Sequence, residues 1–313
     1  MPAGYAHMMI SDKATEIFCA DVTIGPELHG FTQTHSNFIH LGSVAPDYPY
    51  LSLLHPEQGH WADHMHYEFT GDIVKSMAHK LLNVAAAKGT SGEEFIIPFC
   101  WTMGYLSHVT GDLVVHPVIY DIVGSYKGHE GTHRDCEMIQ DSFIYHEITG
   151  NEIEHSSLLP RIRQCSDPND EEKIHPVLRT FWSDMLQTHF PHDFETNPPD
   201  IDHWHERYLD LVGLAGNPRF IGRILDPGHS YTYKPSSQIT AVERRMYLDV
   251  IHLPDGRFGT YLNDAFPKAV NSVAEKWILL GKGITEANVD NFLSAVVNAD
   301  MDTGFETTKH VYW

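Results

Sequence analysis

Basic residues are scarce in this sequence of 313 residues. Lysine and arginine together number 21, against 42 aspartates and glutamates, so the formal net charge is −21 with histidine neutral. A protein that follows a nucleic-acid backbone needs a basic footprint, and docking on anionic lipid needs clustered lysines and arginines. The composition therefore argues against a nucleic-acid partner and against electrostatic attachment to an anionic membrane.

Cysteine is also scarce, and no CxxC pair occurs among Cys19, Cys100, Cys136 and Cys165. This spacing disfavours a disulfide framework and a cysteine-ligated zinc site. The opening MPAGYAHMMISDKATEIF lacks the basic stretch and the uninterrupted apolar core of a signal peptide. No run of 18 apolar residues occurs, so no spanning helix is expected. We therefore expect a cytoplasmic protein without a transmembrane segment.

Internal repeats, low-complexity tracts and clean linkers are missing as well. We therefore interpret residues 1–313 as a single domain, with a core over 1–150 and a helical or lid part over 151–313. Helical periodicity dominates the first half. It predicts a helix over 71–88, a second opened by a Ser91–Glu94 capping box, and a third capped by Thr132 and ending near residue 147.

The second half of the sequence is looser. Proline, glycine and serine predict loops over 187–200 and 226–237. Helices are expected at the ranges 202–216, 265–280 and 285–299, and a short strand pair within 246–262 would turn at the sequence PDG. The expected fold class is all-α, a multi-helix bundle with a small β element in the C-terminal half.

Histidine is the abundant residue. There are 23 histidines, and 14 of them lie within the first 146 residues. Histidine is the commonest metal ligand, and carboxylates often complete such sites. The core over 1–150 is therefore expected to bind metal through histidines and carboxylates at ligand spacing, and many of the other histidines are expected to be incidental surface residues.

The segment SHVTGDLVVHP places His108, Asp112 and His116 at intervals of four residues. At 100° per residue these side chains fall within roughly 80° of one another, on one stripe of a helix. Such a stripe can hold one or two ions. The alternative is a buried helix whose polar groups are satisfied by other partners, which is costly for two histidines and an aspartate.

The segment GTHRDCEMIQD places His133 and Glu137 one turn apart, with Asp141 a further turn on. A histidine and a glutamate at this spacing are also a common exposed pair. Because the first stripe is only a short crossover away, however, they can form a second wall of the same site.

Three further segments carry candidate ligands. In APDYPYL, Asp47 follows a proline that would fix the direction of its carboxylate. An aspartate at this place is explained equally well by an Asx turn. The segment GHWADHMHYEFTGD offers His60, His64 and His66, of which at most two can be ligands. His7 lies close to the start of the chain.

These segments together resemble the zinc-dependent phospholipase C family, which is related in fold to the S1/P1 nucleases. The resemblance lies in MPAGYAH, LGSVAPDYPYL, WADHMHYEFTGD, GYLSHVTGDLVVHPVI and THRDCEMIQD, in consistent order over residues 1–147. Its H-x3-D…H…H-x3-E core is specific. The resemblance implies an all-α fold with a trinuclear zinc cluster that cleaves phosphodiesters, whereas residues 150–313 carry no matching motif.

Carried over residue by residue, the resemblance implies three zinc sites. The first takes Asp47, His66, His108 and Asp112, with His64 as the alternative to His66. The second takes His116, His133 and Glu137. The third takes His7 and the bridging Asp112, together with a terminal amine, for which Pro2 is the candidate if Met1 is removed. Without that amine the cluster holds two ions, or water completes the third site.

The chemistry implied is hydrolysis by a metal-activated water, which Asp47 would orient or deprotonate. The expected ligand is a phosphoester small molecule or a phospholipid headgroup, with Tyr48, Trp61, Tyr67 and Arg134 as candidate substrate-binding residues. Aromatic packing around the ligand loops explains the same tyrosines and tryptophan. The alternative functions are an S1/P1-like single-strand nuclease and a non-catalytic metal-binding protein of the same fold.

Overall fold

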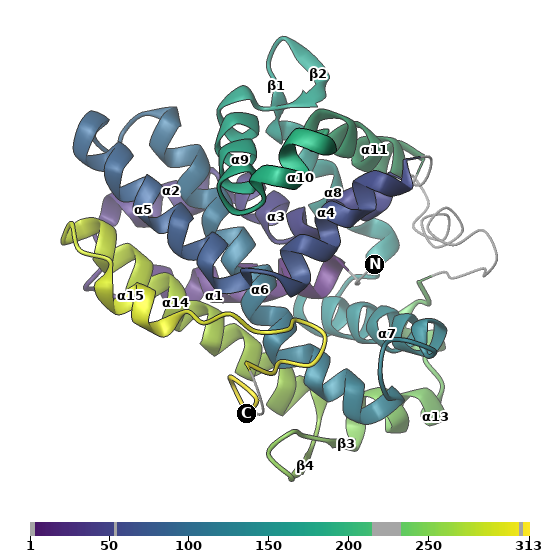
Figure 1. Ribbon diagram of the computed structural model, residues 1–313. Coiled ribbons are helices and arrows are strands. Elements are labelled where there is room, and N and C mark those ends of the chain that lie inside the picture. The colour runs from purple at the N-terminus through teal and green to yellow at the C-terminus, as the bar shows by residue number, and fades with distance from the viewer. Residues whose placement is uncertain (1–3, 53–54, 215–232, 307–308) are drawn as a thin grey trace.

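The computed structural model describes residues 4–52, 55–214, 233–306 and 309–313, which are mostly helical (Figure 1). The first half contains α1 (Gly4–Ala20), α2 (Pro26–Thr34), α3 (Ser36–Gly42), the 3-10 helix η1 (Ala45–Leu51), α4 (Pro56–Tyr67), α5 (Thr70–Lys88), α6 (Glu93–Val123) and α7 (Glu130–Thr149). The predicted all-α fold class is therefore confirmed.

The second half has shorter elements. They are η2 (Ile153–His155), α8 (Leu158–Ile162), η3 (Arg163–Cys165), β1 (Ser166–Asp167), β2 (Asp170–Ile174), α9 (Pro176–His189), α10 (Pro191–Thr196), α11 (Ile201–Leu214), η5 (Ser236–Gln238), α13 (Ala241–Arg244), the π-helical η6 (Arg245–Asp249), β3 (Ile251–His252), β4 (Phe258–Gly259), the π-helical η7 (Tyr261–Ala265), α14 (Phe266–Thr285) and α15 (Asp290–Ala295). The strands form two separate antiparallel hairpins, β1–β2 and β3–β4.

Helix α6 runs through the middle of the molecule, with the other helices around it (Figure 1). Every residue from Phe95 to Ile119 is buried. A helix that is apolar on all sides belongs inside a large core, so its few polar residues need partners there. Helix α6 ends at Gly124, whose φ of 89° suits glycine.

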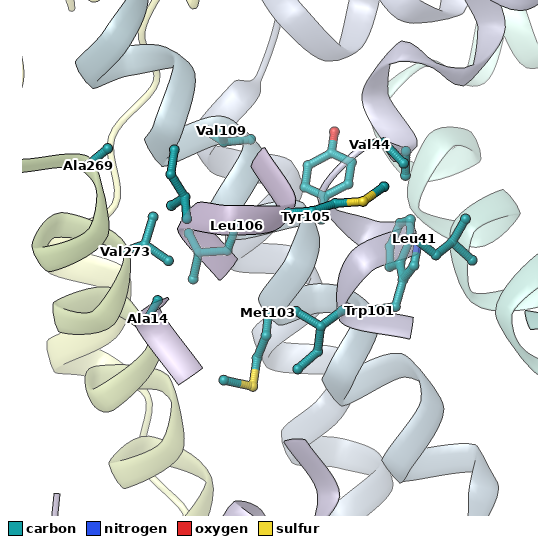
Figure 2. Packing of buried hydrophobic residues seen from close by; sticks show 14 of the residues in the cluster. Ala14, Leu41, Val44, Trp101, Met103, Tyr105, Leu106, Val109, Ala269 and Val273 are labelled. Atoms are coloured by element: carbon teal, nitrogen blue, oxygen red, sulfur yellow. The ribbon is translucent and has the colours of Figure 1, made fainter. Parts of the chain in front are cut away.

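The core continues on both sides of α6. Figure 2 shows Leu106 and Val109 of α6 beside Ala269 and Val273 of α14. The indole of Trp277, also on α14, donates a hydrogen bond to the carbonyl oxygen of Met103 at 2.8 Å. These contacts fix α6 firmly, which matters because it carries the polar stripe.

Two glycines let α3 and α6 touch through their backbones. A Cβ on Gly104 would lie 2.0 Å from the carbonyl oxygen of Ile39, and one on Gly42 would lie 2.2 Å from that of Trp101. No other residue fits this crossing without moving a helix. The crossing brings Ser43, the residue after α3, against α6 at the level of His108.

Several predicted elements agree with the structure. Helix α14 covers the helix expected at 265–280, α11 covers the described part of 202–216, and β3–β4 is the strand pair expected within 246–262. The loop expected at 226–237 falls mostly outside the described residues, and its described end forms η5.

Other expectations were wrong in detail. The segment 187–200 is partly helical, because α9 runs to His189 and Pro191 opens α10, a position that proline favours. Only α15 forms within 285–299, and the hairpin β1–β2 was not anticipated.

The two predicted helix caps are also absent. Helix α6 starts at Glu93 after Gly92, and Glu94 accepts a hydrogen bond from Lys88 instead of closing a capping box. Helix α7 starts at Glu130, so Thr132 lies inside its first turn and donates to the carbonyl of His129.

Candidate metal centre

The polar stripe of α6 is buried in the middle of the fold. His108, Asp112 and His116 are at most 5% exposed. The Nδ1–H of His108 donates to the carbonyl of Ser43 at 3.0 Å, and that of His116 donates to the carbonyl of Met301 at 2.9 Å. Each backbone contact fixes the ring and leaves its Nε2 directed toward the carboxylate of Asp112, as in many histidine metal ligands.

A first group of candidate ligands joins Asp47 and His66 to His108. The Nδ1–H of His66 donates to the carbonyl of Ala62 at 2.7 Å, and its Nε2 lies 3.2 Å from Oδ1 of Asp47 and 3.3 Å from Nε2 of His108. With both Nδ1 atoms committed as donors, the two neutral rings point lone pairs at each other. That arrangement needs a proton or a cation between the rings.

Electrostatics agree with this requirement. Burial lowers the pKa of His66, but the nearby negative charge of Asp47 outweighs it and raises that pKa above its usual value. The site thus favours positive charge at His66, which a bound cation supplies as well as a proton does.

A second group joins α6 to α7. Oε1 of Glu137 lies 3.3 Å from Nε2 of His116 and 3.2 Å from Nε2 of His133. Burial lowers the pKa of His116, but Asp112 and Glu137 outweigh it and raise that pKa to about 10. Burial raises the pKa of Glu137, but His133 and His116 together hold it well below its usual range.

A third group brings α1 to the same carboxylate. Nε2 of His7 lies 3.2 Å from Oδ1 of Asp112, and its ring stacks on His108 with 4.4 Å between centroids. Gly111 of α6 lies against this ring, since a Cβ there would be in van der Waals contact with Nδ1 of His7 at 3.4 Å. Pro2, the candidate terminal ligand, lies outside the described residues.

Asp141 has a different role from the one its spacing suggested. Instead of continuing the stripe of His133 and Glu137, its carboxylate accepts hydrogen bonds from the backbone N–H groups of Tyr5 and Ala6 and from the hydroxyl of Tyr233. It therefore caps the first turn of α1 from another helix. Because His7 follows directly, Asp141 is a positioning residue for the third group.

We expect Asp141→Ala to lower the free energy of unfolding by about 2–4 kcal/mol, since it leaves two helix N–H groups and a buried hydroxyl unpaired. Chemical denaturation of the wild type and the variant measures this difference. Glu147→Ala, an exposed carboxylate on the same helix α7, is the matched control and should change little. Equal stability of the two variants would show that Asp141 does not hold α1.

The three groups fit metal ions by their chemistry. Together they contain five imidazoles and three carboxylates, all buried. In the described part of the chain, Oδ1 of Asp47, Oδ2 of Asp112 and Nδ1 of His133 are buried without a hydrogen bond. Buried polar atoms are rarely left unpaired, and nitrogen and carboxylate ligands are those that zinc prefers. The residues present therefore fit zinc by their chemistry.

The first and second groups open onto a cavity of about 280 Å³. Its walls are Asp47, Tyr50, Asp63, His66, Tyr67, His116, Tyr126, His133, Arg134, Glu137 and Asp302. The hydroxyl of Tyr67 donates to Asp302 at 2.9 Å and that of Tyr50 to Asp63 at 2.8 Å. Asp302 and Tyr126 were not anticipated, because neither lies in a recognisable motif.

Tyr67 and Arg134 thus lie in the cavity wall, whereas two other predicted substrate-binding residues do not. Tyr48 is buried and stacks on Tyr208 with 4.8 Å between ring centroids. Trp61 is fully buried, and its indole donates to the carbonyl of Asn197 at 3.0 Å. Both are core residues, in agreement with the alternative that these aromatic side chains pack around the ligand segments.

His64, the alternative to His66, faces another way. Two residues along a helix correspond to a rotation of roughly 200°, so the two side chains leave α4 on opposite sides. The imidazole of His64 contacts Glu68 and Asp193. Of the two, it is His66 that the structure brings to Asp47 and His108.

Fold and site together define a helical protein with clustered, buried side chains of the types that bind metal ions. The model of the zinc-dependent phospholipase C family matches residues 6–191, and the chain belongs to that family. The match extends past the motif-bearing first 147 residues. Comparisons with curated proteins and with solved structures found no significant match. Among the described helices, none combines the length and the hydrophobicity needed to cross a membrane.

Proposed function

We propose that this protein hydrolyses a phosphodiester, and that the reaction is phospholipase C-type cleavage of a phospholipid or a related phosphoester. The observation that carries the proposal is the set of three ligand groups, joined through His108 and Asp112, of which the first two line one open cavity. Two or three zinc ions bound there would stabilise charge on the phosphoryl oxygens and acidify a water molecule.

Asp47 is the proposed catalytic residue. It lines the cavity, it is 4% exposed, and its Oδ1 makes no hydrogen bond within the described structure. The two prolines beside it in η1, Pro46 and Pro49, restrict the backbone that carries it. A fixed carboxylate at this place can orient the attacking water and accept its proton.

Tyr67 and Arg134 are the proposed substrate contacts. Arg134 brings a guanidinium, the group that pairs best with phosphate oxygens, to a wall otherwise rich in carboxylates. Tyr67, Tyr50 and Tyr126 add aromatic surface, which suits a headgroup carrying a quaternary ammonium. The pocket therefore fits a compact zwitterionic phosphodiester.

The nuclease alternative receives less support from the same features. A strand of nucleic acid needs a basic track along the protein, and this chain carries a net charge of −21. A non-catalytic role would leave so complete a set of buried ligands and so open a cavity unexplained.

The function is tested by removing and restoring the metal. We expect the purified protein to contain at least two equivalents of zinc and to release a phosphorylated headgroup from phosphatidylcholine micelles. Chelation should abolish turnover, and added zinc should restore it, with single-stranded DNA left intact throughout. Less than one equivalent with no recovery on adding zinc would refute the metal centre. Cleavage of DNA but not of lipid would support the nuclease instead.

A further inference from the structure

A fourth cluster of ligand-type side chains lies outside the cavity wall. We propose that His60, His64 and Asp193 bind a further zinc ion that fastens α10 to α4. One ligand atom from each of the three residues lies within 4.8 Å of the others. This proposal concerns binding and local order, and it does not depend on the proposed function.

The spacing on α4 suits a shared ion. His60 and His64 are one turn apart on the helix, and their ring centroids are 4.1 Å apart. Asp193 reaches the pair from α10, with Oδ2 3.2 Å from Nε2 of His64. Two histidines at this interval and one carboxylate form a common zinc ligand set, and water completes the coordination.

The ring of His64 is held in one orientation. It stacks on Phe190 with 4.2 Å between centroids, and its Nδ1 lies 2.8 Å from Oε1 of Glu68. Because the carboxylate of Glu68 only accepts, Nδ1 carries the hydrogen. A carboxylate on the far nitrogen is a frequent feature of histidines that ligate zinc, since it fixes the tautomer and strengthens the ligand.

The other nitrogen of His64 is the atom that lacks a partner. Its Nε2 is buried and makes no hydrogen bond of acceptable geometry in the described structure, although Asp193 is close. With Nδ1 protonated, the lone pair of a neutral ring faces a carboxylate oxygen. The two repel unless a proton or a metal ion lies between them. A metal ion that also takes the exposed His60 satisfies all three groups.

The location gives the ion a structural role. Gln58 of α4 already donates hydrogen bonds to Asn197 and to the carbonyl of Pro198, just beyond α10. A metal bridge from α4 to Asp193 would close the other end of this contact. Helix α4 also carries His66 near its C-terminal end. The bridge would therefore stabilise the helix that presents a proposed ligand of the main centre.

The proposal is tested by comparing zinc content at saturation. We expect His60→Gln and Asp193→Asn each to bind one equivalent less than the wild type. Both positions are exposed or half-exposed, so the fold should be retained. His79→Gln, an exposed histidine on α5 outside the four clusters, is the matched control and should bind as the wild type does. Asp112→Asn, which damages the main centre, should keep the equivalent that His60→Gln loses.

Hydrogen exchange gives a second readout at the site itself. Zinc should slow exchange of the backbone amides of residues 190–197 in the wild type and in His79→Gln, but not in His60→Gln. If His64 instead holds only a proton, His60→Gln and His79→Gln will bind equal zinc and exchange alike. That result would overturn the proposal.

Discussion

Asp47→Asn should lower kcat by about 10²–10⁴-fold, the range of general-base contributions. Asparagine keeps the shape of the side chain but loses the charge and the basicity that orient and deprotonate water. It also removes the charge that raises the pKa of His66 and holds that ring at the centre. Steady-state turnover of phosphatidylcholine measures the effect, and thermal unfolding checks that the fold is retained.

The matched control for Asp47 is Asp63→Asn. Asp63 also lines the cavity, but it is exposed, and its carboxylate accepts a hydrogen bond from Tyr50. Removing one charge at this position should change kcat only slightly. If Asp47→Asn turned over as fast as Asp63→Asn, Asp47 would be a turn residue in η1 and some other group would activate the water.

The candidate metal ligands that lie on regular helices were the easiest part of the site to predict. Regular geometry turns an interval of four residues into one face, so His108, Asp112 and His116 had to lie together once the helix formed. The same holds for His133 and Glu137. Asp47 and His66 were candidates among others until the resemblance selected them. They lie in a 3-10 helix and near a helix end, where spacing alone does not show which way a side chain points.

The features of the site that the sequence did not predict depend on contacts between distant segments. The carbonyl of Ser43 reaches His108 because Gly42 and Gly104 let α3 and α6 approach closely. The carbonyl that orients His116 belongs to Met301, near the C-terminus. Backbone groups have no signature in a sequence. Asp302 enters the cavity from that same segment, which carries no recognisable motif.

The aromatic residues show a related limit. Tyr48 and Tyr50 are two residues apart in one turn, yet the first is in the core and the second lines the cavity. Composition identified an aromatic segment near the ligands. It does not reveal which ring faces inward, because that depends on partners such as Tyr208 of α11, 160 residues further along the chain.

Asp112→Asn should have the largest effect of all, reducing both activity and zinc content. Its Oδ1 lies 3.2 Å from His7 and 3.5 Å from His116, and its Oδ2 lies 3.2 Å from His108. Burial alone would raise the pKa of Asp112, but the three histidines hold it well below its usual range. The carboxylate is therefore charged, and it is shared by groups from α1 and α6.

An asparagine at 112 leaves these imidazoles, or the ions they bind, without their shared negative charge. Breaking a buried charge pair costs about 3–5 kcal/mol, so we expect a loss of that size in the unfolding free energy. Turnover should fall to background, and zinc should be lost from the first and third groups. The group of His116, His133 and Glu137 keeps its own carboxylate and should retain its ion. Asp121→Asn, an exposed position on the same helix, should change none of these values. Wild-type zinc content in Asp112→Asn would mean that this carboxylate does not link the groups.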